Sequence, residues 1–134
     1  MPMDGEGRKK PETSRAGWEG MPVLVTGAGG FIASHLVEAL VGRVAKVRAF
    51  LRSNSRDQRG NLRLLEPETF ERIELVRGDL RDLETVRNAM AGMDAVFHLA
   101  AMTSIPYSYE HPCEVVEINI GGALNVLLAG KECG

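Results

Sequence analysis

Cysteine is scarce in this sequence, and it has neither long apolar runs nor a large charge excess of either sign. Only Cys113 and Cys133 occur, without C-x-x-C spacing, so the sequence predicts neither a zinc site nor a disulfide framework. The formal net charge of -2 gives no electrostatic support for binding nucleic acid. No apolar run approaches the roughly 18 residues that span a bilayer, and the N-terminus has no apolar signal-peptide core. These absences predict a cytoplasmic protein without a metal, nucleic-acid or membrane partner.

The composition is that of one globular domain preceded by a tail. The chain has 134 residues, of which 44% are hydrophobic and 25% are charged, enough for a single core. Residues 1–20 are rich in glycine, proline and charge, so they cannot bury enough surface to offset the entropy cost of ordering. We therefore expect a disordered N-terminal tail over residues 1–20 and a folded domain over residues 21–134.

From Pro22 onward, short apolar segments alternate with segments of helical periodicity. This alternation implies βαβ units with right-handed crossovers, so the predicted fold class is α/β, a doubly wound parallel sheet. The predicted strands are 22–26, 45–51, 72–76 and 94–101. The predicted helical segments are 34–42, 59–70, 81–92 with Asp82 as its N-cap, and 113–130 with an interruption at Gly121 and Gly122.

The turn after the first predicted strand is rich in glycine. A strand that feeds such a turn into a helix directs backbone N–H groups and the positive end of the helix dipole at one spot, which attracts a pyrophosphate. The spacing G-x-G-x-x-G fails, because Ile32 occupies the sixth position counted from Gly27. The spacing G-x-x-G-x-x-[G/A] fits Gly27, Gly30 and Ala33, and its last position governs helix–strand packing. We therefore predict a Rossmann-like dinucleotide cradle; the alternative is a tight turn without a ligand.

The end of the second predicted strand carries a cation and no carboxylate. A carboxylate at this position accepts a hydrogen bond from the ribose 2′-hydroxyl of NAD, whereas an arginine accommodates the 2′-phosphate of NADP. Arg52 stands here, and no carboxylate follows before Asp57. The predicted cofactor is therefore NAD(P), with NADP favoured. The alternative for Arg52 is a solvated loop charge.

Four stretches together resemble one family, the extended short-chain dehydrogenases/reductases of the NAD(P)-dependent epimerase/dehydratase type. The opening "VLVTGAGGFIASHLVEAL" is similar to the family's T-G-x-x-G-F-I-G-S-H-L. Residues 76–82 resemble its G-D-x-x-D, residues 97–101 its H-x-A-A, and residues 119–129 its N-x-x-G-T-x-N-L-L-x-A. The resemblance covers residues 22 to about 133, and "VRAFLRSNSR" and "SIPYSY" look most like nucleotide-sugar epimerases and dehydratases.

The resemblance implies cofactor-binding roles for residues that follow the first, third and fourth predicted strands. Asp79 would accept a hydrogen bond from the adenine amino group, with Leu80 beside the ring, and Asn119 would lie near the cofactor and a proton-relay water. Residues 99–101 would pass under the ribose and pyrophosphate. With Arg52, the predicted cofactor-binding residues are Gly27, Gly30, Phe31, Ile32, Asp79, Leu80, Leu99, Ala100, Ala101 and Asn119, Phe31 and Ile32 acting mainly through backbone N–H groups.

Three polar residues in the stretches that resemble the family have simpler interpretations. Asp79 can be a polar turn residue at the end of a strand. Asn119 can be a buried asparagine that satisfies local backbone groups. His98 lies among apolar residues, and we interpret it as a core histidine without a catalytic role.

The sequence departs from the family pattern in its catalytic residues. Family chemistry depends on a Tyr-x-x-x-Lys pair, in which the tyrosinate takes the proton of a substrate hydroxyl while hydride passes to the nicotinamide. Here Tyr107 is followed four residues later by His111, and Tyr109 by Cys113. No catalytic residue is therefore predicted within the chain.

The resemblance then implies the N-terminal part of a nucleotide-sugar epimerase or dehydratase, with the sheet truncated after about four strands and the catalytic half absent. The dinucleotide would be the partner of this part, and a nucleotide sugar only the partner of a full-length, homodimeric parent. The fourth strand would form an exposed apolar edge of the sheet. The alternatives are a non-catalytic NAD(P)-binding regulatory module and an inert truncated product.

Overall fold

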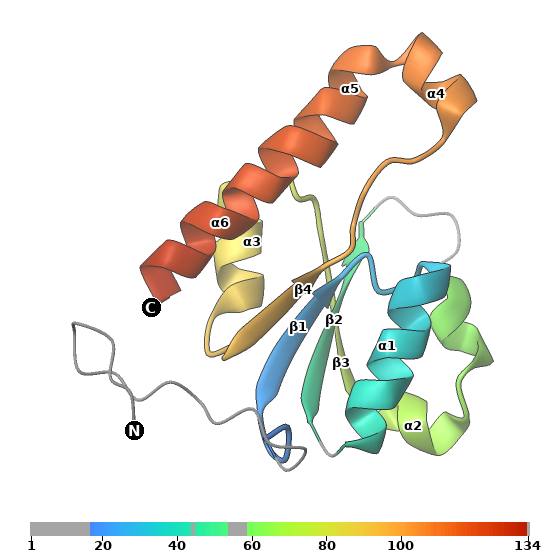
Figure 1. The fold of residues 1–134 in the computed structure, drawn as a ribbon, viewed down its shortest axis with the longest axis vertical. Helices are drawn as coiled ribbons and strands as arrows, with labels where there is room; N and C mark the ends of the chain where they lie inside the picture. The colour runs from blue at the N-terminus through green and yellow to red at the C-terminus, as the bar shows by residue number, and fades with distance from the viewer. Residues whose placement is uncertain (1–16, 44, 54–58, 134) are drawn as a thin grey trace.

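The computed structural model describes residues 17–43, 45–53 and 59–133 as one parallel sheet with helices on both faces (Figure 1). The strands are β1 (Pro22–Thr26), β2 (Lys46–Arg52), β3 (Ile73–Gly78) and β4 (Ala95–His98), and they lie in the order β3-β2-β1-β4. The chain returns to the far side of β1 after β3, and such a reversal creates a crevice at the carboxyl ends of the strands. The predicted α/β, Rossmann-like fold is confirmed, and within the described residues β4 pairs with β1 alone, as an edge strand.

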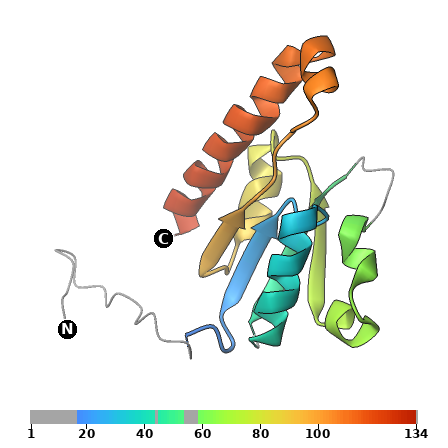
Figure 2. The same cartoon turned by 45° about the vertical axis from the view of Figure 1, so that its right-hand side comes forward.

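The two faces of the sheet are covered by different helices (Figure 2). The helices α1 (Phe31–Gly42) and α2 (Pro67–Glu71) lie on one face, and α3 (Leu83–Met90) and α6 (Gly122–Cys133) lie on the other. In β1, Val23 and Val25 join the core under α1, whereas Leu24 joins the core under α3 and α6. A strand buried on both faces needs no polar alternation, which explains the continuous apolar run in the sequence.

The predicted start of α3 is confirmed. Asp82 accepts a hydrogen bond from the Glu84 backbone N–H at 3.1 Å and another from the Thr85 hydroxyl at 2.6 Å. These bonds satisfy one of the amide groups that a helix leaves open in its first turn. Local sequence was sufficient here because every partner lies within three residues of Asp82.

The last predicted helix is longer than expected and changes its winding. It consists of α5 (Pro112–Val116), a π-helical turn η2 (Glu117–Gly121) and α6, and a further helix α4 (Ile105–Glu110), which the periodicity did not predict, precedes it. Neither Gly121 nor Gly122 breaks the helix. A Cβ on Gly122 would lie 3.0 Å from the Leu80 Cβ, so this glycine lets the helix approach the loop after β3.

The combined helix Pro112–Cys133 is 22 residues long and, by length and composition alone, apolar enough to cross a membrane. The sequence analysis considers only uninterrupted apolar runs, and Glu114 and Glu117 interrupt the run in this helix. In this fold the helix packs against α3 through Val126 and Ala129. Its other side leaves several large apolar residues exposed: Val116, Ile120, Leu124, Leu127 and Leu128.

Residues 1–16 of the predicted tail lie outside the described residues. Residues 17–20 form a turn, and the Trp18 ring lies 5.7 Å from the Phe97 ring, centroid to centroid. The Met21 backbone N–H donates to the Trp18 carbonyl at 3.2 Å. Ordered packing therefore begins before Met21, because the indole covers apolar surface beside β4.

Candidate functional site

The glycine turn joins the carboxyl end of β1 to the first residue of α1. Gly27 has φ +66°, a left-handed conformation that favours glycine, and the Gly30 N–H donates to the Gly27 carbonyl at 2.9 Å. The helix begins at Phe31, and no side chain caps it at Gly30. Amides in the first turn of a helix have no carbonyl partner within that helix. The turn therefore leaves the amides of Phe31 and Ile32 without partners in the helix, at the positive end of the helix dipole, which is a geometry that suits an anion.

Gly27 is required for a reason that its spacing did not predict. A Cβ at this position would lie 2.7 Å from the Ala100 Cα and 2.8 Å from the Ala100 nitrogen. The obstacle is the protein backbone, so the packing of the chain itself requires glycine here. Gly27 lets the turn after β1 contact the segment after β4, and the two form one continuous floor.

A third backbone segment, which the sequence analysis does not predict, completes the turn. The Asn61 N–H donates to the Gly29 carbonyl at 2.9 Å, at the start of the short helix η1 (Gly60–Leu64). Gly60 has φ +55°, and a Cβ there would lie 2.5 Å from the Gly29 oxygen. The sequence predicts a helical segment over residues 59–70 but not its contact with the glycine turn. The local sign of this contact is Gly60, because a residue without a side chain can adopt the left-handed conformation that lets the two backbones approach so closely.

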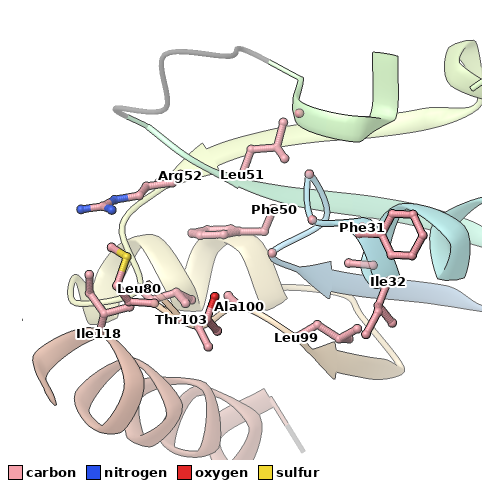
Figure 3. A pocket seen from close by; sticks show the side chains of 18 of the residues that line it. Phe31, Ile32, Phe50, Leu51, Arg52, Leu80, Leu99, Ala100, Thr103 and Ile118 are labelled. Carbon is pink, nitrogen blue, oxygen red and sulfur yellow. The ribbon is translucent and has the colours of Figure 1, made fainter. Parts of the chain in front are cut away.

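A cavity of about 760 Å³ opens between the glycine turn and the carboxyl ends of the strands. Figure 3 shows Phe31 and Ile32 at one end of it and Arg52 at the other. The structure brings ten of the eleven predicted cofactor-binding residues to this cavity: Gly27, Gly30, Phe31, Ile32, Arg52, Asp79, Leu80, Leu99, Ala100 and Ala101. Sequence reasoning missed Gly29, Phe50, Leu51, Gly60, Gly78, Met102, Thr103 and Ile118, which also line it.

Asn119 is the predicted residue that does not line the cavity. Its Oδ1 accepts from the Met102 N–H at 2.7 Å, and its Nδ2 donates to the Met102 carbonyl at 3.0 Å. Both functional groups of the amide therefore satisfy local backbone, which is the simpler interpretation of this residue. Because Met102 lines the cavity, Asn119 acts on the site indirectly, by fixing the segment after β4 to the π-helical turn.

Arg52 does not stand alone at the end of β2. Its Nη2 lies 2.8 Å from the Glu114 Oε1, and about a third of the arginine side chain is exposed. The other Glu114 oxygen accepts the Tyr107 hydroxyl. These hydrogen bonds, that of Tyr107 first, lower the pKa of Glu114 below its usual value of 4.5. The predicted phosphate-binding cation therefore carries an ionised partner from α5.

Asp79 is paired as well. Its carboxylate accepts from the Arg81 Nε at 3.0 Å and from the Arg81 Nη2 at 2.5 Å. This pairing with the guanidinium lowers the pKa of Asp79 below its usual value of 3.8. The Arg81 backbone N–H also donates to this carboxylate, at 2.9 Å, so of its about four acceptor positions roughly one is left for a further donor such as an adenine amino group. Its position on the cavity is compatible with both interpretations of this residue.

His98 is half-buried on the edge strand β4, and its hydrogen bond is made within the sheet. Its Nδ1 is 2.8 Å from the Thr26 Oγ1, and the same hydroxyl accepts the Ala100 N–H at 3.2 Å. Burial lowers the pKa of His98 below its usual value of 6.5. The imidazole is therefore neutral at physiological pH and bridges β1 to β4, without a place among the residues that line the cavity.

Comparison with known proteins agrees with this geometry. The chain is 40% identical over 113 residues to cinnamoyl-CoA reductase 1 from Petunia hybrida, covering 84% of this chain and 32% of that protein. Its fold matches the UDP-N-acetylglucosamine 4-epimerase of Methanobrevibacter ruminantium M1 with TM-score 0.71 and 32% identity, covering 85% of this chain and 35% of the epimerase. It also matches the UDP-glucose 4-epimerase of Stenotrophomonas maltophila, solved with NAD, with TM-score 0.66, 27% identity, and coverage of 85% and 34%.

The chain thus spans about a third of the length of the relatives it matches. The sequence profile described as GDP-mannose 4,6 dehydratase matches residues 24–134, which include the glycine turn and every residue that lines the cavity. The chain therefore belongs to the GDP-mannose 4,6 dehydratase family, a member of the NAD-dependent epimerase/dehydratase group of short-chain dehydrogenases/reductases.

Proposed function

We propose that this chain is the NAD(P)-binding part of a nucleotide-sugar epimerase or dehydratase. The observation that carries the proposal is the uncapped start of α1 at the glycine turn, which opens onto a cavity of about 760 Å³ at the carboxyl ends of the strands. That volume lies in the range of known ligand pockets. The NAD bound to the UDP-glucose 4-epimerase of Stenotrophomonas maltophila, a fold relative, supports a dinucleotide as the ligand.

The cavity suggests how its residues would hold the dinucleotide. The amides of Phe31 and Ile32 would bind the pyrophosphate, and the small residues Ala100 and Ala101 would allow the ribose to lie close to the backbone. Leu80, buried at 7% exposure, would pack beside the adenine while Asp79 accepts its amino group. Arg52 is the one cation among the described residues that line the cavity, and it supports the preference for NADP.

The bound nicotinamide would supply hydride transfer, and the chain's own residues would bind and orient it. The 134 residues contain no Tyr-x-x-x-Lys pair, so we assign the chain no proton-transfer role. In a full-length parent, a nucleotide sugar would be the substrate and oxidation of a sugar hydroxyl the first step. A cytoplasmic location and a homodimeric parent belong to the same proposal.

A second candidate is a regulatory module that binds NAD(P) without catalysis. The two candidates share the cofactor site and differ in turnover. Genomic sequence that continues past residue 134 into a Tyr-x-x-x-Lys helix would support the enzyme, whereas a regulatory module would bind cofactor with no such sequence.

The cofactor site can be tested with an anionic substitution that the fold tolerates. Ile32 is 72% exposed and lies in the first turn of α1, where a carboxylate interacts favourably with the helix dipole. Ile32→Glu should therefore leave the free energy of unfolding unchanged or slightly raised, while repelling the pyrophosphate and weakening NADH and NADPH binding by about tenfold or more.

Leu64→Glu is the matched control, since Leu64 is 74% exposed and does not line the cavity. It should bind both dinucleotides as the wild type does. Isothermal titration of the folded chain provides the measurement. Failure of the wild-type chain to bind either dinucleotide, or unchanged binding by Ile32→Glu, would contradict the proposal.

A further inference from the structure

Arg52 reaches the cavity from the end of β2, but its charge is already engaged. The guanidinium Nη2 is 2.8 Å from the Glu114 Oε1, a distance typical of a charge-assisted hydrogen bond. Arg52 lines the cavity and Glu114 does not, so the carboxylate contacts the cation from outside the cavity lining. The side chains are 35% and 25% exposed, which leaves the pair partly shielded from water.

Glu114 is held in this position by more than Arg52. The Tyr107 hydroxyl, from α4, donates to its Oε2, and the Arg81 Nη1 lies 3.8 Å from its Oε1. Together with Arg52, these partners come from three separate segments of the chain: the end of β2, α4 and the turn after β3. The carboxylate is therefore not a freely moving surface group. Each of them also stabilises the ionised form of Glu114, which therefore stays charged at neutral pH.

Among the described residues, the charges paired around Arg52 and Glu114 largely cancel one another. The cations Arg52 and Arg81 contact three carboxylates, those of Asp79, Glu114 and Glu117, so the described cluster has one excess negative charge. A 2′-phosphate is strongly anionic near neutral pH. It would have to displace Glu114 from Arg52, or bind beside it, whereas a ribose 2′-hydroxyl faces neither requirement.

We propose that Glu114 is a specificity-determining residue that restrains NADP binding by competing with the 2′-phosphate for Arg52. The inference rests on the proposed dinucleotide site. Arg52 supplies the attraction for the phosphate, and Glu114 limits how much of it the cofactor can use. The ratio of NADPH to NADH affinity is thus set by a carboxylate 62 residues away from the strand end that normally decides it.

The test measures NADPH and NADH affinity of the 134-residue chain by isothermal titration, with folding checked by circular dichroism. Glu114→Gln keeps the shape of the side chain and removes its charge. It should tighten NADPH binding about fivefold, the size expected for a partly exposed ion pair, and change NADH binding by less than about twofold. Glu114→Ser should give the same direction, which guards against a defect peculiar to the glutamine variant.

Glu117→Gln is the matched control, because Glu117 lies 3.7 Å from Arg81, whereas the ion-pair partner of Arg52 is Glu114. It should leave the affinity ratio unchanged. In an Arg52→Gln background, Glu114→Gln should no longer favour NADPH. An unchanged ratio in both Glu114 variants, or weaker NADPH binding, would overturn the inference and leave the site intact; binding of neither dinucleotide by the wild type would instead contradict the proposed function.

Discussion

Gly27 and Ala100 approach so closely that no side chain fits between them, since an added Cβ would lie 2.7 Å from the Ala100 Cα. The contact joins the turn after β1 to the segment after the edge strand β4. Both segments line the same cavity. The floor of the candidate site is therefore also a packing contact between two strand ends. Experiments must separate the contribution of this contact to stability from its contribution to ligand binding.

Gly27→Ala should destabilise the chain by about 3 kcal/mol or more. The substitution places a side chain at φ +66° and also drives a Cβ into fixed backbone, and each of these costs free energy. Urea denaturation followed by circular dichroism measures the free energy of unfolding.

Two other glycines separate the cost of a positive φ from the cost of the close backbone contact. Gly92 has φ +74° with nothing within 4 Å of an added Cβ, so Gly92→Ala should cost only about 1 kcal/mol. Gly42, the last residue of α1, has open space and no positive φ, so Gly42→Ala should change stability by less than about 1 kcal/mol. Equal effects at Gly27 and Gly92 would show that the approach to Ala100 is looser than described.

Asn119→Asp should loosen the segment after β4. The aspartate can still accept the Met102 N–H but places a carboxylate oxygen against the Met102 carbonyl, at the position where Nδ2 donates over 3.0 Å. A half-buried acceptor that loses its donor costs about 1–3 kcal/mol. Hydrogen exchange at the Met102 amide should accelerate, and Asn119→Ala should accelerate it further. Exchange that stays at the wild-type rate in both variants would exclude the positioning role.

His98 should make stability depend on pH below 6.5. Burial lowers its pKa in the folded chain below 6.5, so in this range the unfolded chain binds more protons. The free energy of unfolding therefore falls as the pH is lowered from 6.5. The paired carboxylates Asp79 and Glu114, with usual values of 3.8 and 4.5 and lower ones when folded, add their own loss at still lower pH.

His98→Asn should abolish the part of this dependence that begins as the pH falls through 6.5, as measured by denaturation at closely spaced pH values. His35→Asn is the control, because His35 lies on the exposed side of α1, its side chain 65% exposed. That variant should retain the wild-type slope. A slope that survives in His98→Asn would assign the effect to another group.

Truncations in α6 should show which side of the helix carries stability. Val126 is 8% exposed and belongs to the core under α3, so Val126→Ala should cost about 2 kcal/mol. Leu127 is 71% exposed, and Leu127→Ala should cost less than about 0.5 kcal/mol although it removes more atoms. The opposite order in thermal denaturation would mean that the helix is rotated about its axis.

Local patterns identified most of the fold. The buried strand β1, the start of α1 and the Asp82 cap of α3 depend on residues within a few positions of each other, so sequence alone could identify them. The helix α4 was missed because its six residues, Ile105–Glu110, are too few to show a helical period. The burial of Trp18 was missed because it depends on Phe97, which lies on another strand.

Sequence by itself determined the α/β class, the glycine turn and the set of residues that meet at the strand ends. It could do so because parallel strands place their carboxyl ends at one edge whatever the connections between them. Only the tertiary structure decided which groups neutralise one another there. Arg52 is a cation in the sequence and an ion-pair partner of Glu114 in the fold, since the crossovers bring together residues 62 positions apart. The charge that a cofactor meets is therefore a property of the packed chain and not of any single motif.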